Sequence, residues 1–100
     1  MFMVYVLRSD RNGQLYVGYT TNLKNRIERH NKGNVISTKS KRPWKLIFAE
    51  AYISQSDALR REQYFKTTQG KIALKHMLRE TLKLRTEILS TSQKSNEMHH

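Results

Sequence analysis

The sequence of 100 residues contains no cysteine, which excludes disulfide bonds and thiolate metal ligands. It has no apolar run near the ~18 residues that a membrane-spanning helix requires. The apolar stretch at residues 1–7 has no basic lead-in and no small-residue cleavage site after it, so it predicts a strand rather than a signal peptide. Together these absences favour a cytoplasmic protein. Glycine-rich phosphate loops, His-x3-His metal pairs and serine-nucleophile motifs are also missing.

Acidic residues are scarce. Eight Asp and Glu stand against nineteen Lys and Arg, which gives a formal net charge of +11. An excess this large on a small domain indicates a polyanionic partner. Nucleic acid, an acidic membrane surface and an acidic protein each satisfy charge alone, and contacts of Lys and Arg with a phosphate backbone make nucleic acid the favoured partner. The 37% apolar composition is typical of a globular protein, and the length fits one domain.

The pattern of apolar residues, caps and turn residues predicts six elements and a tail. The predicted strands are Met3–Ser9, Gln14–Thr20 and Trp44–Tyr52, with a turn at Asn12-Gly13 between the first two. The predicted helices run from a cap at Thr20, Thr21 or Asn22 to about Asn31, from Ser54 or Ser56 to about Thr68, and, after a break at Gly70, from Lys71 to about Leu89. A polar loop at Lys32–Pro43 precedes the third strand, and residues 90–100 are predicted to be a disordered tail. The order β-β-α-β-α-α predicts one α+β domain over residues 1–89, with helices packed on a small antiparallel sheet. The third strand is apolar on both faces, so we expect it to be well covered, with Trp44, Leu46 and Phe48 in the core.

The hairpin carries the first candidate site residues. A two-residue Asn12-Gly13 turn would pair Ser9 with Tyr16 and Leu7 with Gly18. Because opposed residues share a face of a sheet, this pairing divides the side chains into two sets. The first set is Tyr5, Leu7, Ser9, Tyr16, Gly18 and Thr20, and the second, which has the character of a core, is Val4, Val6, Leu15 and Val17. Two phenols then flank Gly18, which has no side chain to block close approach; the alternative is a pair of half-buried tyrosines without a catalytic role.

The first helix places a cation and an imidazole on its apolar stripe. Leu23, Arg26, Ile27 and His30 fall on one side at about 100° per residue. The guanidinium of Arg26 suits phosphate oxygens, and the imidazole of His30 can move a proton near neutral pH. Both side chains could instead be solvated, with His30 capping the end of the helix. Sharing a stripe with two apolar residues favours an inward orientation.

Glu62 lies near the middle of the apolar stripe of the second helix, between Ala58 and Phe65. A carboxylate that faces a core is costly unless it is paired or binds a metal ion. The structural interpretation is an ion pair with Arg26 or Arg60. The functional interpretation is a ligand of Mg²⁺, which binds through carboxylates, water and phosphate.

These residues, taken in order, resemble a known family. Met3-Val4-Tyr5, Tyr16-Val17-Gly18, Arg26 with His30, and Glu62 are similar to the signature of the GIY-YIG nucleases. The runs LYVGYTTNL, RPWKLIFAEAY and ALRREQYFK resemble its small stand-alone bacterial branch, related to the excision-repair nuclease C subunit. The resemblance covers about residues 2–80. It implies a three-stranded antiparallel sheet flanked by helices and a metal-dependent endonuclease that hydrolyses DNA.

The resemblance also implies a role for each site residue. Glu62 would hold Mg²⁺ or Mn²⁺, Arg26 would bind the scissile phosphate, and Tyr16 would activate the attacking water. Tyr5 and His30 would help to position or deprotonate that water. The sequence departs from the family at Met3, where glycine is usual, at Tyr19, where some members carry lysine, and in having no asparagine between Glu62 and Asn96. A DNA-binding module whose nuclease site has decayed is therefore the alternative function.

The basic loop and its borders are the predicted nucleic-acid contact. The residues concerned are Lys32, Lys39, Lys41, Arg42 and Lys45. A loop of this charge can follow a phosphate backbone without reading bases. Because one small domain leaves no room for a separate specificity domain, we expect recognition of DNA structure rather than of sequence. A third possibility is a structural subunit that recruits a partner to DNA through the helix at residues 71–89.

Overall fold

A computed structural model describes residues 1–83. The elements are β1 (Phe2–Ser9), β2 (Leu15–Thr20), α1 (Leu23–Asn31), a 3-10 helix η1 (Ile36–Lys41), β3 (Trp44–Tyr52), α2 (Gln55–Lys66) and α3 (Thr68–Met77). The three strands form one antiparallel sheet in the order β2-β1-β3. The predicted α+β class and its three-stranded antiparallel sheet are confirmed.

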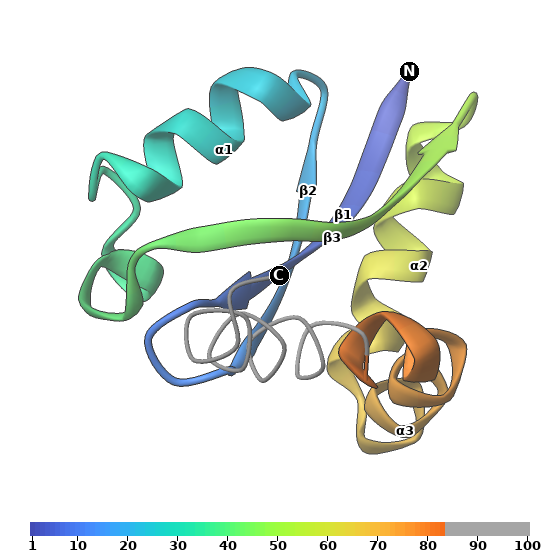
Figure 1. Ribbon diagram of the computed structural model, residues 1–100. Helices are drawn as coiled ribbons and strands as arrows, with labels where there is room; N and C mark the ends of the chain where they lie inside the picture. The colour runs from blue at the N-terminus through green and yellow to red at the C-terminus, as the bar shows by residue number, and fades with distance from the viewer. Residues whose placement is uncertain (84–100) are drawn as a thin grey trace, which may run out of the picture.

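The sheet separates two apolar clusters. On one face Val4 and Val6 pack with Ala58 and Phe65 of α2 and with Leu74 of α3. On the other face Tyr5, Leu7 and Trp44 form a smaller cluster, against which Tyr16, Leu23 and Ile27 pack. Figure 1 shows α1 on one side of the sheet and the α2–α3 pair on the other. The alternation of β1 therefore sends successive side chains to different helices.

The hairpin register differs from the predicted one by two residues. Tyr5 lies opposite Gly18 and Leu7 opposite Tyr16. The chain turns through a longer loop, in which the Ser9 hydroxyl accepts from the backbone N–H groups of Arg11 and Asn12 and Gly13 has φ +77°. An even shift preserves the alternation of faces, so the predicted division of side chains is correct although the pairing was wrong.

β3 is an edge strand and is less covered than predicted. Its register with β1 shifts between Val6 and Leu7, where Val6 pairs with Phe48 and Leu7 with Leu46. The extra residue sends Trp44 to the α1 face and Phe48 to the α2 face, so they do not form one continuous series. Leu46 remains 42% exposed. Both faces of β3 are apolar because the strand serves two different clusters.

The helices begin at the expected types of cap. The side chains of Asn22, Ser54 and Thr67 accept from the backbone N–H three residues later, at the starts of α1, α2 and α3. The segment predicted to be a polar loop contains η1, which is tied to the hairpin because the Ser9 hydroxyl donates to the Lys41 carbonyl at 2.6 Å. Arg42-Pro43, which follows, is a cis peptide bond.

The break between α2 and α3 lies at Thr67, not at Gly70 as predicted. Gly70 is buried inside α3, where a Cβ would overlap the backbone carbonyl of Tyr64. Its lack of a side chain lets the two helices approach closely, so the glycine serves packing rather than termination. α3 ends at Met77, and residues 79–83 are helical again. The predicted continuation to Leu89 and the predicted tail lie outside the described residues. No helix within residues 1–83 is long and apolar enough to cross a membrane.

Candidate active site

Tyr5, Tyr16 and His30 meet on the α1 face of the sheet. The Tyr5 hydroxyl lies 2.8 Å from His30 Nε2, and both residues are fully buried. The Tyr16 ring packs edge-on against His30 with ring centroids 5.0 Å apart, and lies 6.4 Å from the Tyr5 ring. Tyr16 alone of the three is partly exposed. The inward orientation predicted for His30 is thus correct, and the ring does not cap its helix.

The protonation states of His30 and Tyr5 decide which atom donates in each buried hydrogen bond. Burial, with Arg26 and Arg29 nearby, lowers the pKa of His30 to about 4, so its ring is neutral at neutral pH. Burial also raises the pKa of Tyr5, as does the neighbouring Tyr16, so Tyr5 keeps its proton. The Tyr5 O–H must then donate to Nε2, because a buried donor without an acceptor is costly. Nδ1 is left to donate to the Thr38 hydroxyl, 2.8 Å away, which donates in turn to the Val35 carbonyl.

Gly18 makes room for Tyr5. A Cβ at Gly18 would overlap the Cζ and hydroxyl atoms of the Tyr5 phenol. Close approach to this glycine was predicted, but the group that approaches it is Tyr5 from the same sheet, and that phenol fills the space above Gly18. A larger residue at position 18 would displace the phenol from His30.

Arg26 of α1 and Glu62 of α2 act on the Tyr5 phenol electrostatically and with opposite sign. Arg26, on α1, is partly exposed, and its charge lowers the pKa of Tyr5, whereas the charge of Glu62, on α2, raises it. Glu62 Oε2 accepts from Lys66 Nζ at 3.1 Å, and the glutamate side chain is only 13% exposed. Glu62 is thus ion-paired, as the structural alternative predicted, but with Lys66 rather than with an arginine, and Arg60 binds Asp57 instead.

The single carboxylate of Glu62 fits one kind of metal site. No group of three or more His, Cys, Asp and Glu side chains gathers anywhere in residues 1–83, so the described part of the chain offers no all-protein cage. Mg²⁺ commonly binds through one or two carboxylates, with water and substrate phosphate completing its shell. A single, mostly buried carboxylate that already attracts the Lys66 ammonium fits that mode of binding.

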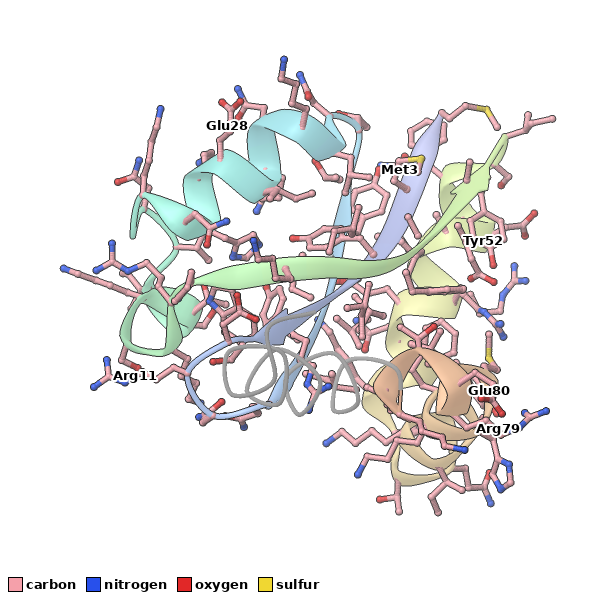
Figure 2. The ribbon with its side chains drawn as sticks, in the orientation of Figure 1. Met3, Arg11, Glu28, Tyr52, Arg79 and Glu80 are labelled. Atoms are coloured by element: carbon pink, nitrogen blue, oxygen red, sulfur yellow. The ribbon has the colours of Figure 1, made fainter. Side chains whose placement is uncertain are left out.

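The predicted nucleic-acid contacts lie around η1. Lys39 and Lys41 belong to its last turn, and Arg42 Nε donates to the Lys39 carbonyl at 2.8 Å. Lys32 caps the end of α1, and Lys45 follows on β3; both are exposed. Figure 2 shows Arg11 of the hairpin loop on the same side of the molecule, and its Nη1 donates to the Ser40 carbonyl at 3.2 Å. The basic segment is therefore held to the hairpin by hydrogen bonds.

Sequence reasoning missed two residues of this region. Thr38 lies eight positions after His30 in a segment predicted to be a loop, so no periodicity signals their contact. Lys66 lies one helical turn after Glu62, and an acidic residue four positions before a lysine is a readable ion-pair signal. The contact of Thr38 with His30 could be found only from the tertiary structure, whereas the pairing of Lys66 with Glu62 could have been predicted from the sequence.

Comparison with known proteins agrees with the resemblance. Residues 1–76 match the family model described as the GIY-YIG catalytic domain. The chain therefore belongs to the GIY-YIG family. Its relatives in this family include proteins called UPF0213.

A UPF0213 protein of Pediococcus pentosaceus is 52% identical over 66 residues, covering 65% of this chain and 68% of the relative. One from Staphylococcus haemolyticus is 42% identical over 73 residues, covering 72% and 88% respectively. The solution NMR structure of a UPF0213 protein from Bacillus halodurans, 31% identical, aligns with a TM-score of 0.49 over 77% of this chain and 85% of that one.

Proposed function

We propose that this protein is a metal-dependent endonuclease that hydrolyses phosphodiester bonds in DNA and selects DNA by structure. The observation that carries the proposal is the partly exposed Tyr16, whose ring packs on the buried Tyr5–His30 pair. The charges of Arg26 and Glu62 both shift the pKa of Tyr5. Family membership supports the same chemistry.

Tyr16 is the phenol available to the attacking water, because Tyr5 and His30 are buried. Its oxygen would accept a hydrogen bond from that water and so orient it, with a lone pair of the water oxygen facing phosphorus. As the new P–O bond forms, the water proton leaves through the Tyr16 oxygen to solvent. The P–O bond to the departing deoxyribose oxygen breaks, and that oxygen takes a proton from solvent. Tyr5 and His30 act as positioning residues, since their rings fix the plane on which Tyr16 packs.

Charge stabilisation falls to Arg26 and to the region of Glu62. Hydrolysis builds negative charge on the phosphoryl oxygens, and a fixed guanidinium stabilises it. A divalent ion on Glu62 would supply further charge stabilisation and help to hold the phosphate. Lys66 neutralises the same carboxylate through the 3.1 Å contact, so Lys66 and a metal ion would compete for Glu62.

A non-catalytic DNA-binding module is the second candidate. It rests on the family asparagine that this sequence lacks after Glu62. The two functions differ in one readout, because a binding module retains DNA without cutting it.

A cleavage panel tests the proposal. Single-stranded, nicked, flapped and branched DNA would be incubated with Mg²⁺ or Mn²⁺ and with wild-type protein or the Glu62→Ala variant. We expect cutting of at least one branched or flapped substrate by the wild type, loss of cutting in EDTA, and loss in Glu62→Ala. Binding of DNA with no cutting under any of these conditions would favour the binding module.

A further inference from the structure

A second basic surface lies beside β2, on the side of α2 and α3. It is a groove of about 490 Å³ between residues 13–17 of the hairpin and the lysines Lys66, Lys71 and Lys75. Phe65 and Leu74 form part of its apolar floor. None of the basic residues predicted from the sequence to contact DNA lines this groove.

The rim of the groove is strongly cationic. Its described lining contains three lysines and no acidic residue. Lys71 and Lys75 are both exposed and lie one helical turn apart on α3, so their side chains project as neighbours. Lys66 is paired with Glu62, but Lys71 and Lys75 repel one another, so a polyanion in the groove would relieve this repulsion.

Arg8 adds a free hydrogen-bond donor near the same groove. Its Nη1 is buried and finds no hydrogen-bond partner. The guanidinium packs over Gly13, which lines the groove, and a Cβ there would lie 3.4 Å from Nη2. An unsatisfied buried guanidinium N–H is costly. The Arg8 guanidinium therefore adds positive charge at the hairpin end of the groove.

The groove and the candidate active site lie on opposite faces of the sheet and share Tyr16 of β2. Tyr16 lines the groove, while its ring packs on His30 and Trp44 on the α1 face. β2 is an edge strand, so a ligand can cross its outer edge from one face of the sheet to the other. We infer that the groove binds the phosphate backbone of the cleaved nucleic-acid strand on one side of the scissile bond. This inference rests on the proposed nuclease function.

Binding measurements on single lysine variants test the groove. Glu62→Gln serves as the parent so that the probe, a fluorescent flapped DNA, is not cut. Lys71→Gln and Lys75→Gln are each added to it and titrated over a range of salt concentrations. One lost phosphate contact should reduce the log-log salt slope by about 0.9 and weaken binding up to about eightfold at 0.1 M salt.

Arg60→Gln is the matched control, because it removes one positive charge from an exposed α2 residue that lines a separate hollow with Tyr52 and Tyr64. We expect its salt slope to equal that of the parent. Lysine variants with the same salt slope as Arg60→Gln would overturn the proposed binding of DNA in the groove while leaving the proposed function intact. A parent that fails to bind DNA would overturn both.

Discussion

Thr38 holds the imidazole of His30 in one tautomer. The Tyr5–His30–Thr38 chain is buried, and each of its two ring contacts measures 2.8 Å. Trp44 Nε1 donates to the Thr38 carbonyl at 2.9 Å, so Thr38 also holds the Trp44 ring that packs against Tyr16. A threonine in a basic 3-10 helix thus links the predicted DNA-contact segment to the candidate active site.

Replacing Thr38 by valine tests this link. The change keeps the shape but leaves Nδ1–H of His30 unsatisfied, so we expect a loss of about 1–3 kcal/mol in the free energy of unfolding. Thr38→Ser retains the hydroxyl and should lose clearly less. Urea denaturation of the two variants beside wild type measures both effects. Equal stability of Thr38→Val and wild type would contradict the directional chain.

His30 also predicts a dependence of stability on pH. Its pKa is lowered to about 4 in the folded protein, against an ordinary value of 6.5. The unfolded chain therefore binds a proton more readily between these values. The contribution is fully present above pH 6.5 and is lost as pH falls towards 4, amounting to about 3 kcal/mol.

The measurement is the free energy of unfolding at several pH values between 4 and 7 for wild type and His30→Gln. The glutamine variant starts from lower stability, but its slope with pH should be shallower over this range. Parallel slopes would show that His30 titrates normally in the fold.

Among the elements, the α2–α3 junction depends on Gly70. Alanine is favoured over glycine inside a helix by about 1 kcal/mol. Here, however, the added Cβ would overlap the Tyr64 carbonyl, which is backbone and cannot swing away. We expect Gly70→Ala to lower the free energy of unfolding by about 1–3 kcal/mol.

Gln69→Ala is the control for Gly70→Ala, because Gln69 is exposed in the same helix turn. Thermal or urea unfolding of both variants gives the comparison. A Gly70→Ala protein as stable as Gln69→Ala would mean that the helices can separate without cost.

The same junction shows where sequence patterns succeed and fail for the elements. The strands and helix caps follow from local composition, and the stripe of α1 correctly turned Leu23, Ile27 and His30 inward. The position of the break depends on contact between two helices, which no local pattern contains. The predicted hairpin register was wrong because the Ser9 hydroxyl stabilises a longer loop than the two-residue Asn12-Gly13 turn.

For the candidate site, parity and helical rotation were enough to bring Tyr5, Tyr16 and His30 to one face. They could not show that Tyr5 and His30 are buried and Tyr16 is not, because exposure depends on η1 and Trp44 covering the cluster. The contact with Thr38 depends on the fold of η1 for the same reason.

Across the whole protein, the distribution of charge determines how we expect it to bind DNA. Within residues 1–83, basic side chains gather on two surfaces, the η1 region and the groove beside α3. Figure 2 shows the acidic Glu28 of α1 pointing away from the sheet. A polyanion that contacts both surfaces would pass over Tyr16.

We therefore expect DNA binding to weaken steeply with salt. Contacts by the three exposed basic residues around η1, Lys32, Lys39 and Lys45, should alone give a log-log slope of about −2.7, since each phosphate contact contributes ~0.9. Fluorescence anisotropy at several salt concentrations measures the slope. A slope near zero would reject the η1 region as a DNA contact.

The enzyme assignment depends on Glu62. Glu62→Gln keeps the volume of the side chain and removes the charge that would hold a divalent ion. Its ion-pair partner, Lys66, is 44% exposed, so loss of this pair should cost at most about 1 kcal/mol. The fold and DNA binding should survive, and a loss of cleavage could not be attributed to unfolding.

The decisive measurement is the rate of DNA cleavage by Glu62→Gln, with a thermal melt of the same preparation and Glu28→Gln as a charge-matched control on the exposed side of α1. The account predicts a folded Glu62→Gln protein that cuts orders of magnitude more slowly than wild type, because metal stabilisation of the transition state contributes several kcal/mol. Glu28→Gln should cut normally. A folded Glu62→Gln protein that cuts as fast as wild type would contradict the account.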